Sequence, residues 1–157
     1  MPIAPQAPAM IPALATAAGP IRASTIVMTP GTVRTIKLLV VDDVPSVRRG
    51  LRMRLSLESD LQVVGEAASG EEALAVVRAL QPDVILMDVE MPGLDGLVAT
   101  SAMRSVAPQS AVVTLSLHDD AASREKALAA GATAFVGKHE ASDALLVAIR
   151  DAAHSAA

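Results

Sequence analysis

Short apolar runs that alternate with longer helical patterns constrain the fold of this chain more than any other feature. Five runs are predicted to be strands, at residues 37–41, 61–67, 83–87, 111–115 and 133–136. The first, third and fourth runs are nearly continuous in apolar residues, which is typical of strands covered on both faces in a parallel sheet. Helical periodicity follows each run, at residues 45–58, 70–80, 95–105, 120–130 and 141–154. This alternation predicts an α/β protein with a (βα)5, doubly wound parallel five-stranded sheet.

Two of the predicted helix ends carry recognisable signals. Ser69 and Glu72 match a capping box, in which a hydroxyl and a carboxylate bond the first free amides of a helix. Gly131 fits the position after a last helical turn, because glycine adopts the left-handed backbone conformation there at little cost. The sequence therefore predicts one helix that begins near residue 70 and another that ends near residue 130.

Residues 1–36 differ in composition from the rest of the chain. They hold six of the ten prolines, no Asp or Glu, and two charged residues, Arg22 and Arg34. So many prolines among few large apolar residues oppose a membrane span, and the basic start of a signal peptide is missing. We predict a disordered, Ala/Pro-rich N-terminal extension over 1–36, with a targeting role as the alternative, and a folded domain over 37–157. The predicted location is cytoplasmic, with no membrane partner.

The composition excludes several classes of function. The chain has no cysteine, so disulfides, thiolate zinc sites, iron–sulfur clusters and cysteine nucleophiles are all excluded. Its one aromatic residue, Phe135, cannot form a stacking platform for single-stranded nucleic acid. The net charge of −4 opposes general binding to a phosphate backbone. We therefore expect no direct nucleic-acid partner.

Polar residues gather where the predicted strands end. In doubly wound sheets, functional sites lie at the carboxyl ends of the strands, near the point where the strand order reverses. Residues that are far apart in the sequence therefore converge on one shallow pocket. Four features fall at such ends: Asp42-Asp43 after the first strand, Asp88 at the end of the third, Ser116 after the fourth and Lys138 after the fifth.

The converging side chains favour phosphoryl transfer. Carboxylates 4 Å apart repel one another by about 4 kcal/mol per pair at an effective dielectric constant near 20, unless a cation neutralises them. A water-accessible cluster of oxygen ligands suits Mg²⁺, or Mn²⁺ as a second candidate. Lys138 adds a positive charge and Ser116 a hydroxyl donor, so the pocket can hold a tetrahedral dianion between two cations. With no glycine-rich phosphate loop for a nucleotide, the best-placed acceptor is the carboxylate of Asp88.

Four segments within residues 37–153 together resemble the receiver domain of two-component response regulators. They are LLVVDD (38–43), VILMDVEMPGLDG (84–96), VVTLSLHDD (112–120) and GATAFVGKHE (131–140), in the order and spacing of that family. The resemblance implies a flavodoxin-like sheet with strand order 2-1-3-4-5. It also implies a phosphorelay function, in which Asp88 takes a phosphoryl group from a phosphohistidine on a sensor histidine kinase or a histidine phosphotransfer protein.

The same resemblance assigns roles to the other site residues. The Mg²⁺ ligands that it implies are Asp42, Asp43, Asp88 and the backbone carbonyl of Glu90. Ser116 and Lys138 would contact the bound phosphoryl oxygens. Phe135 matches the aromatic switch position, which turns inward in this family when the Ser/Thr hydroxyl moves toward the phosphate. Ser116 and Phe135 would thus convert phosphorylation into a change of the protein-interaction surface.

His139 follows Lys138 where receivers often have proline, as in regulators that carry a LuxR-type DNA-binding domain. A cis peptide bond between these two residues would cost about 3 kcal/mol, so the sequence leaves its geometry open. No helix-turn-helix pattern follows the fifth predicted helix, which indicates a receiver without an output domain. The partners that the resemblance implies for the phosphorylated domain are an unknown downstream protein or a second copy of the chain, in a dimer that forms on phosphorylation. The alternative is a fragment of a DNA-binding response regulator.

Two further function classes use some of the same features. A haloacid-dehalogenase phosphatase also uses an Asp nucleophile and Mg²⁺, but it needs a second Asp two residues later, where this chain has Glu90. An adaptor with the receiver fold would bind its partners without phosphorylation. We expect no enzyme in the usual sense, only self-catalysed phosphotransfer and dephosphorylation. Glu90 and His118 are hypothesised to tune the phosphoryl lifetime.

Purely structural interpretations exist for several of these residues. Asp43 could cap the first helix beside Pro45, with Asp42 as a solvated neighbour. Ser116 could cap a turn, and Phe135 could simply fill core volume. The three histidines share no metal-ligand spacing, so no zinc site is predicted.

Overall fold

The computed structural model describes residues 34–140 and 142–156. Five parallel strands form one sheet in the order β2-β1-β3-β4-β5, and five helices connect and follow them. The predicted (βα)5 fold and strand order are therefore confirmed. The elements are β1 (Ile36–Val41), α2 (Pro45–Leu55), β2 (Leu61–Ala67), α3 (Gly70–Leu80), β3 (Val84–Asp88), α4 (Gly96–Val106), β4 (Ala111–Ser116), α5 (Ala121–Ala130), β5 (Ala134–Gly137) and α6 (Ser142–Ala156).

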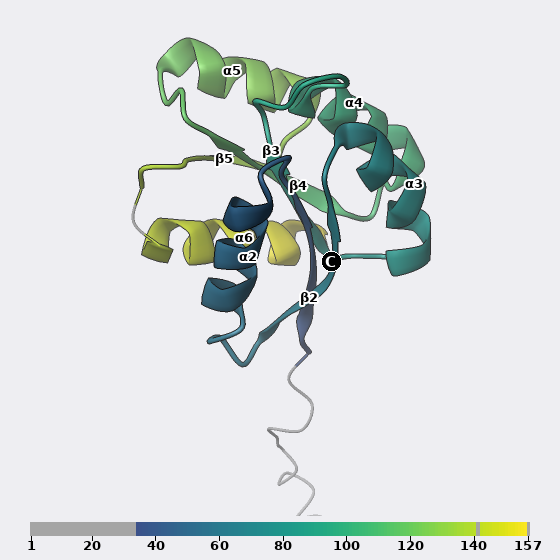
Figure 1. Ribbon diagram of the computed structural model, residues 1–157, viewed down its shortest axis with the longest axis vertical. Helices are drawn as coiled ribbons and strands as arrows, with labels where there is room; N and C mark the ends of the chain where they lie inside the picture. Colours follow the sequence, from purple (N-terminus) through teal and green to yellow (C-terminus); the bar gives the residue numbers. More distant parts are fainter. Residues whose placement is uncertain (1–33, 141, 157) are drawn as a thin grey trace, which may run out of the picture. The chain divides into compact units, whose positions relative to one another are not determined.

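Helices cover both faces of the sheet (Figure 1). Helices α2 and α6 pack on one face, where Leu55 and Ile149 join apolar side chains of β1, β3 and β4 in one buried cluster. Helices α3 and α4 pack on the other face, where Val77 and Met103 join a second cluster with Ile85 of β3. All residues of β3 and β4 are buried. This explains why their sequences lack a polar face.

Both predicted helix ends are present. The Ser69 hydroxyl accepts a hydrogen bond from the backbone N–H of Glu72, 3.1 Å away, and the Glu72 carboxylate accepts one from the N–H of Ala68. Gly131 ends α5 in the left-handed conformation, with φ 112°. Its N–H and that of Ala132 bond the last free carbonyls of that helix. Local sequence signals thus fixed these two boundaries correctly.

The first helix is shorter than predicted. Helical periodicity extends to residue 58, but α2 ends at Leu55, and the next apolar residue, Leu57, is 75% exposed. The guanidinium of Arg150 on α6 bonds the carboxylates of Glu58 and Asp60, each at 2.8 Å. These distant contacts hold the segment after α2 in a turn that local periodicity does not indicate. The predicted extension over 1–36 lies outside the described residues except for its last three positions.

The register of the sheet brings the strand ends together. Val41 of β1 pairs with Met87 of β3, so Asp42 and Asp88 follow side by side. Ser116 of β4 pairs with Gly137 of β5, directly before Lys138. The carboxyl edge of strands β1, β3, β4 and β5 therefore carries all four polar features that the sequence predicted there.

Candidate functional site

Three carboxylates meet at the carboxyl edge of the sheet. Asp42, Asp43 and Asp88 each present an oxygen atom within 4.8 Å of the others. Asp42 and Asp88 are buried at 0% and 1% exposure, whereas Asp43 is partly exposed. Oxygen ligands at this spacing, open to solvent on one side, fit a hard divalent cation such as Mg²⁺. The structure thus brings together the three aspartates of the predicted metal site.

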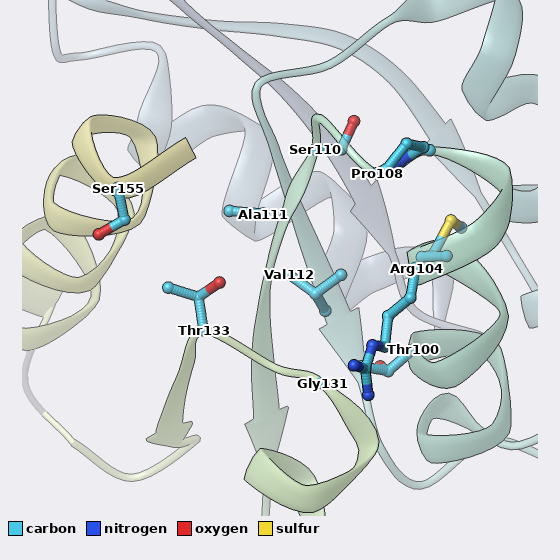
Figure 2. A pocket seen from close by; sticks show the side chains of 11 residues that line it. Thr100, Arg104, Pro108, Ser110, Ala111, Val112, Gly131, Thr133 and Ser155 are labelled. Carbon is cyan, nitrogen blue, oxygen red and sulfur yellow. The ribbon is translucent and has the colours of Figure 1, made fainter. Parts of the chain in front are cut away.

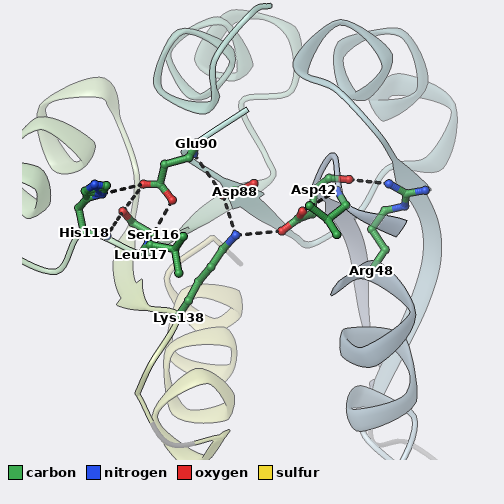
Figure 3. Close-up of polar contacts among 9 residues, drawn as sticks. Asp42, Arg48, Asp88, Glu90, Ser116, Leu117, His118 and Lys138 are labelled. Atoms are coloured by element: carbon green, nitrogen blue, oxygen red, sulfur yellow. Dashed lines mark hydrogen bonds and ion pairs between the residues drawn. The ribbon is translucent and has the colours of Figure 1, made fainter. Parts of the chain in front are cut away.

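Lys138 reaches into this cluster from the end of β5 (Figure 3). Its ammonium Nζ lies 3.0 Å from Oδ1 of Asp88 and 3.1 Å from Oδ2 of Asp42. The residues joined by these contacts are 50 and 96 positions apart in the sequence, so only the sheet register places them together. The lysine partly offsets the repulsion between the two buried carboxylates. The structure thus places Lys138 in contact with the acidic cluster, at the edge of the sheet where the sequence predicted these residues to converge.

Burial and charge perturb the ionisation of this pair. Burial raises the pKa of Asp88 to about 6, and the neighbouring Asp42 charge adds to the increase, while Lys138 opposes it. For Lys138, burial lowers the pKa, but hydrogen bonds and charge interactions with Asp88 and Asp42 outweigh it, so the pKa is raised. The raised pKa of Lys138 keeps its ammonium charged at neutral pH, beside the buried side chains of Asp88 and Asp42.

Asp42 makes hydrogen bonds to protein groups in the loop and helix that follow it. Its Oδ1 accepts a hydrogen bond from the N–H of Val44 at 2.9 Å, and its backbone carbonyl accepts one from Nη1 of Arg48 at 2.6 Å. The structural alternative for this segment is wrong: the residue that caps α2 is Val44, with no side-chain cap, and Asp42 is buried. Pro45 does occupy the first turn of α2, as its fixed φ favours. Arg48 was not predicted as part of the site, although it lies one helical turn after Val44.

A second polar group lies beside the acidic cluster, at the end of β4 (Figure 3). The Ser116 hydroxyl is buried and donates a hydrogen bond to Oε2 of Glu90, and it accepts one from the N–H of His118 at 3.0 Å. Oε1 of Glu90 accepts a hydrogen bond from the N–H of Leu117 at 3.0 Å. The sequence predicted a metal-binding role for the backbone carbonyl of Glu90 and a hypothesised effect of Glu90 and His118 on the phosphoryl lifetime. The contact between the Glu90 carboxylate and the Ser116 hydroxyl was not predicted.

Phe135 occupies a small buried cluster apart from the main core. It is 6% exposed and packs with Ala127 and Ala132, with Leu97 beside them. The guanidinium carbon of Arg124 lies 4.8 Å from the centre of the ring, and Nη1 donates a hydrogen bond to the backbone carbonyl of Phe135 at 3.2 Å. A cation–π contact of this kind stabilises the buried ring. Arg124 was not predicted as a neighbour of the switch position, and the switch role itself stays a prediction.

The question of the Lys138–His139 peptide bond is answered by the backbone geometry. The described segments contain no cis peptide bond, so this bond is trans. The N–H of Lys138 donates to the carbonyl of Ser116 at 2.7 Å, which anchors the loop that carries the lysine to the end of β4.

A cavity of about 310 Å³ lies away from the acidic cluster (Figure 2). It opens at the amino end of β4, between Arg104 of α4, Gly131 and Thr133. None of the aspartates of the site lines it. We therefore place the candidate site at the opposite, carboxyl end of the strands, where the charged groups converge.

Two solved domains of response regulators share this architecture. The described fold matches the receiver domain of the response regulator NarL from Mycobacterium tuberculosis, with a TM-score of 0.73 and 37% identity over 77% of this chain and 98% of that one. It also matches the response regulator domain of CheB from Thermotoga maritima, with a TM-score of 0.71 and 36% identity over 77% and 98% of the two chains. The class defined by the fold is therefore the CheY-like, flavodoxin-fold receiver.

The family model for the response regulator receiver domain matches residues 38–150, so the chain belongs to this family. The response regulator GacA of Pseudomonas syringae pv. syringae (strain B728a) is 44% identical over 115 residues, which are 73% of this chain and 54% of that protein. The chain thus spans about half the length of the curated relatives it matches. Receiver domains of this family bind Mg²⁺ through acidic residues, and response regulators are phosphorylated by histidine kinases. None of the helices in residues 34–140 and 142–156 combines the length and the apolar composition that a membrane span requires.

The raised pKa of Asp88 predicts a pH-dependent stability in metal-free buffer. Folding raises this pKa from 3.8 to about 6, so the folded state binds the proton more tightly than the unfolded state. The stabilisation is present below pH 4 and is lost as the pH rises through 6, by up to about 3 kcal/mol. Urea unfolding from pH 4 to 7 in EDTA should show this loss in the wild type, and Asp88→Asn should be more stable than the wild type at pH 7.

The comparison between the two proteins isolates Asp88 from the other carboxylates. Hydrogen bonds from Arg150 lower the pKa of Glu58 and Asp60, so these groups favour folding at higher pH, but they act equally in the wild type and in Asp88→Asn. If the free energy of unfolding changed with pH in the same way in both proteins, burial of the ionised Asp88 carboxylate would not destabilise the fold.

Proposed function

We propose that this chain is a phosphorylation-dependent signalling receiver in which Asp88 accepts a phosphoryl group from a phosphohistidine. The observation that carries the proposal is the bridging position of the Lys138 ammonium, 3.0 Å from Asp88 and 3.1 Å from Asp42, at the edge of the acidic cluster. A fixed cation beside a buried carboxylate can offset the charge that develops on a phosphoryl group in transfer. The donor would be a sensor histidine kinase or a histidine phosphotransfer protein.

The acidic cluster would hold the metal ion. Asp42, Asp43, Asp88 and the backbone carbonyl of Glu90 are the proposed ligands of Mg²⁺, with Mn²⁺ as a second candidate, and the 4.8 Å spacing of the three carboxylate oxygens supports them. When bound, Mg²⁺ would neutralise charge on the phosphoryl oxygens and orient them. Lys138 Nζ would contact a phosphoryl oxygen from the opposite side, together with the hydroxyl of Ser116.

The nucleophile would be the Oδ2 atom of Asp88. Oδ1 of this residue already accepts a hydrogen bond from the N–H of Glu90 at 3.1 Å and pairs with Lys138. A lone pair of Oδ2 would form the new oxygen–phosphorus bond while the phosphorus–nitrogen bond of the phosphohistidine breaks. The electron pair of that bond goes to the imidazole nitrogen, which takes up a proton. Attack of water on the resulting acyl phosphate later releases inorganic phosphate and restores the carboxylate. The proposed chemistry is therefore self-catalysed phosphotransfer and dephosphorylation of the domain itself.

Phosphorylation would then shift a two-state equilibrium. If the unphosphorylated form favours the inactive state by 99:1, inversion needs about 5.5 kcal/mol of differential stabilisation. A dianion that is paired with Lys138 and bonded to Ser116 can supply energy of this kind, because such charge-assisted contacts are strong when water is excluded. Ser116 and Phe135 are the proposed switch residues, and the surface that they change would bind an unknown downstream protein or a second copy of the chain.

Domain limits and location are part of the same proposal. We assign the receiver domain to residues 37–157 and the N-terminal extension to 1–36, which agrees with the family match over 38–150. The cytoplasm is the proposed compartment, since the phosphohistidine donor must reach Asp88 there. A chain that acts within a longer DNA-binding regulator remains the alternative, which is suggested by the length of the matched relatives.

The proposal predicts one added phosphoryl group on Asp88. The wild-type protein is incubated with acetyl phosphate and Mg²⁺, or with a phosphorylated histidine kinase, and its intact mass is measured. We expect a single phosphoryl group in the wild type and none in Asp88→Asn or without Mg²⁺. Modification of Asp88→Asn to the same extent would contradict the assignment. A wild type that stays unmodified by every donor would support the adaptor alternative, and sustained turnover of a generic phosphate monoester would support the phosphatase.

A further inference from the structure

The side chain of Glu90 turns away from the acidic cluster and toward the end of β4 (Figure 3). Its Oε2 accepts the proton of the Ser116 hydroxyl, and its Oε1 accepts the N–H of Leu117 at 3.0 Å. The imidazole Nδ1 of His118 lies 4.0 Å from Oε2. One carboxylate thus accepts hydrogen bonds from two consecutive residues, Ser116 and Leu117, and has the imidazole of the next residue beside it.

These donors form a small anion-binding group at the edge of the proposed phosphoryl site. A hydroxyl and a backbone N–H that point to one place are the donors with which proteins hold oxyanions. Ser116 is also the residue proposed to bond a phosphoryl oxygen. The Glu90 carboxylate has a negative charge and acceptor oxygens, as a bound phosphoryl group would.

The Ser116 hydroxyl can donate a hydrogen bond either to the Glu90 carboxylate or to a phosphoryl oxygen, but not to both. A serine hydroxyl has one proton to donate, and here that proton is given to Glu90. The oxygen of the same hydroxyl accepts the N–H of His118 at 3.0 Å, so the geometry of the group is fixed from both sides. Ser116 therefore cannot donate to a phosphoryl oxygen until Glu90 releases it.

Glu90 is able to leave this position without a change of fold. Its backbone N–H is bonded to Oδ1 of Asp88 at 3.1 Å, which fixes the start of the loop, but its side chain is 32% exposed. Ser116, by contrast, is buried at the end of β4, where its backbone is held in the sheet beside Gly137. The Glu90 side chain therefore has to leave before the Ser116 hydroxyl can turn toward a phosphoryl oxygen.

We propose that the Glu90 carboxylate is an internal substitute for the phosphoryl group, which occupies the donors of Ser116 and Leu117 in the unphosphorylated domain. This inference rests on the proposed function of Asp88. An incoming phosphoryl group displaces Glu90 to gain these donors, so the glutamate stabilises the resting state and weakens binding of the modified one. Glu90 is a positioning residue for Ser116, and it sets how strongly the site responds to its anion.

Beryllofluoride, an anion that attaches to aspartate carboxylates as an analogue of a phosphoryl group, tests the proposal. Its apparent dissociation constant is measured by calorimetry at saturating Mg²⁺. We expect Glu90→Ala to bind it about tenfold more tightly than the wild type, which corresponds to about 1.4 kcal/mol. Glu90→Gln should fall between the two, because its amide oxygen still accepts the N–H of Leu117 but carries no charge. Glu125→Ala, on the exposed surface of α5, is the matched control and should leave the constant unchanged.

A double-mutant cycle separates competition from a merely structural effect. In a Ser116→Ala background the main contested donor is absent, so Glu90→Ala should tighten binding by only about threefold instead of tenfold. Thermal unfolding confirms that each variant is folded. Equal or weaker binding by both Glu90 variants would overturn the proposal while leaving the role of Asp88 intact. No binding of beryllofluoride by any protein, the wild type included, would overturn the proposed function and this inference with it.

Discussion

Replacement of Gly96 by alanine is expected to lower the free energy of unfolding by about 3 kcal/mol or more. A Cβ atom at this position would lie 2.0 Å from the backbone oxygen of Asp88 and 2.8 Å from Cα of Val89. Both atoms belong to the main chain, so they cannot move aside as a flexible side chain would. Gly96 begins α4, and its N–H donates to the carbonyl of Val89 at 3.3 Å, so the close approach is built into the start of the helix.

The same substitution should disturb the site, since the carbonyl that it displaces belongs to Asp88. Urea unfolding of the purified variant measures the loss of stability. Gly50→Ala is the matched control: this glycine lies inside α2, and an added Cβ meets nothing within 4 Å. Alanine is the better helix former, so Gly50→Ala should raise stability by about 0.5–1 kcal/mol. A Gly96→Ala protein as stable as the wild type would show that α4 does not pack this closely on the end of β3.

The fold was predictable because its signals are local and repeat along the chain. The continuous apolar runs of β3 and β4 indicate strands buried on both faces, and the structure buries every residue of both. Capping residues such as Ser69 and Gly131 mark helix ends through bonds to their own neighbours. Where a boundary depends on a distant partner, the prediction was wrong. The end of α2 is the example, since Arg150 bonds Asp60 from 90 positions away.

The site was predictable to the level of position but not of side-chain direction. Asp42, Asp88 and Lys138 were identified because each lies at or just after the end of a strand, and parallel strands bring their ends to one edge. The direction of the Glu90 side chain depends on which donors are within reach, and these come from Ser116 and Leu117, 26 and 27 residues later. No spacing in the sequence reports such a choice. The Arg124 contact with Phe135 was missed for the same reason.

Replacement of Lys138 by methionine should separate phosphoryl transfer from metal binding. We expect the rate of modification by acetyl phosphate to fall by about 10²–10³-fold, because the substitution removes a fixed cation from the place where negative charge develops. Affinity for Mg²⁺ should change in the opposite direction. The ammonium lies 3.1 Å from Asp42 and 3.0 Å from Asp88, so it competes with a metal ion for both carboxylates and repels it. Without that charge, Mg²⁺ should bind about tenfold more tightly, a gain of about 1.4 kcal/mol.

These opposite changes distinguish a direct role of Lys138 from general damage to the site. A distorted pocket would lose both metal affinity and rate, whereas removal of one charge alone strengthens the first and weakens the second. Calorimetric titration with Mg²⁺ and the time course of the intact mass give the two quantities on the same preparation. Lys126→Met, on the exposed surface of α5, removes the same charge away from the cluster and should change neither by more than about twofold. If Lys138→Met lost metal affinity and rate to the same extent, the lysine would act by holding the carboxylates in place and not on the phosphoryl group. A direct charge effect requires the opposite result for the metal, because removal of an ammonium that repels Mg²⁺ increases the affinity for Mg²⁺.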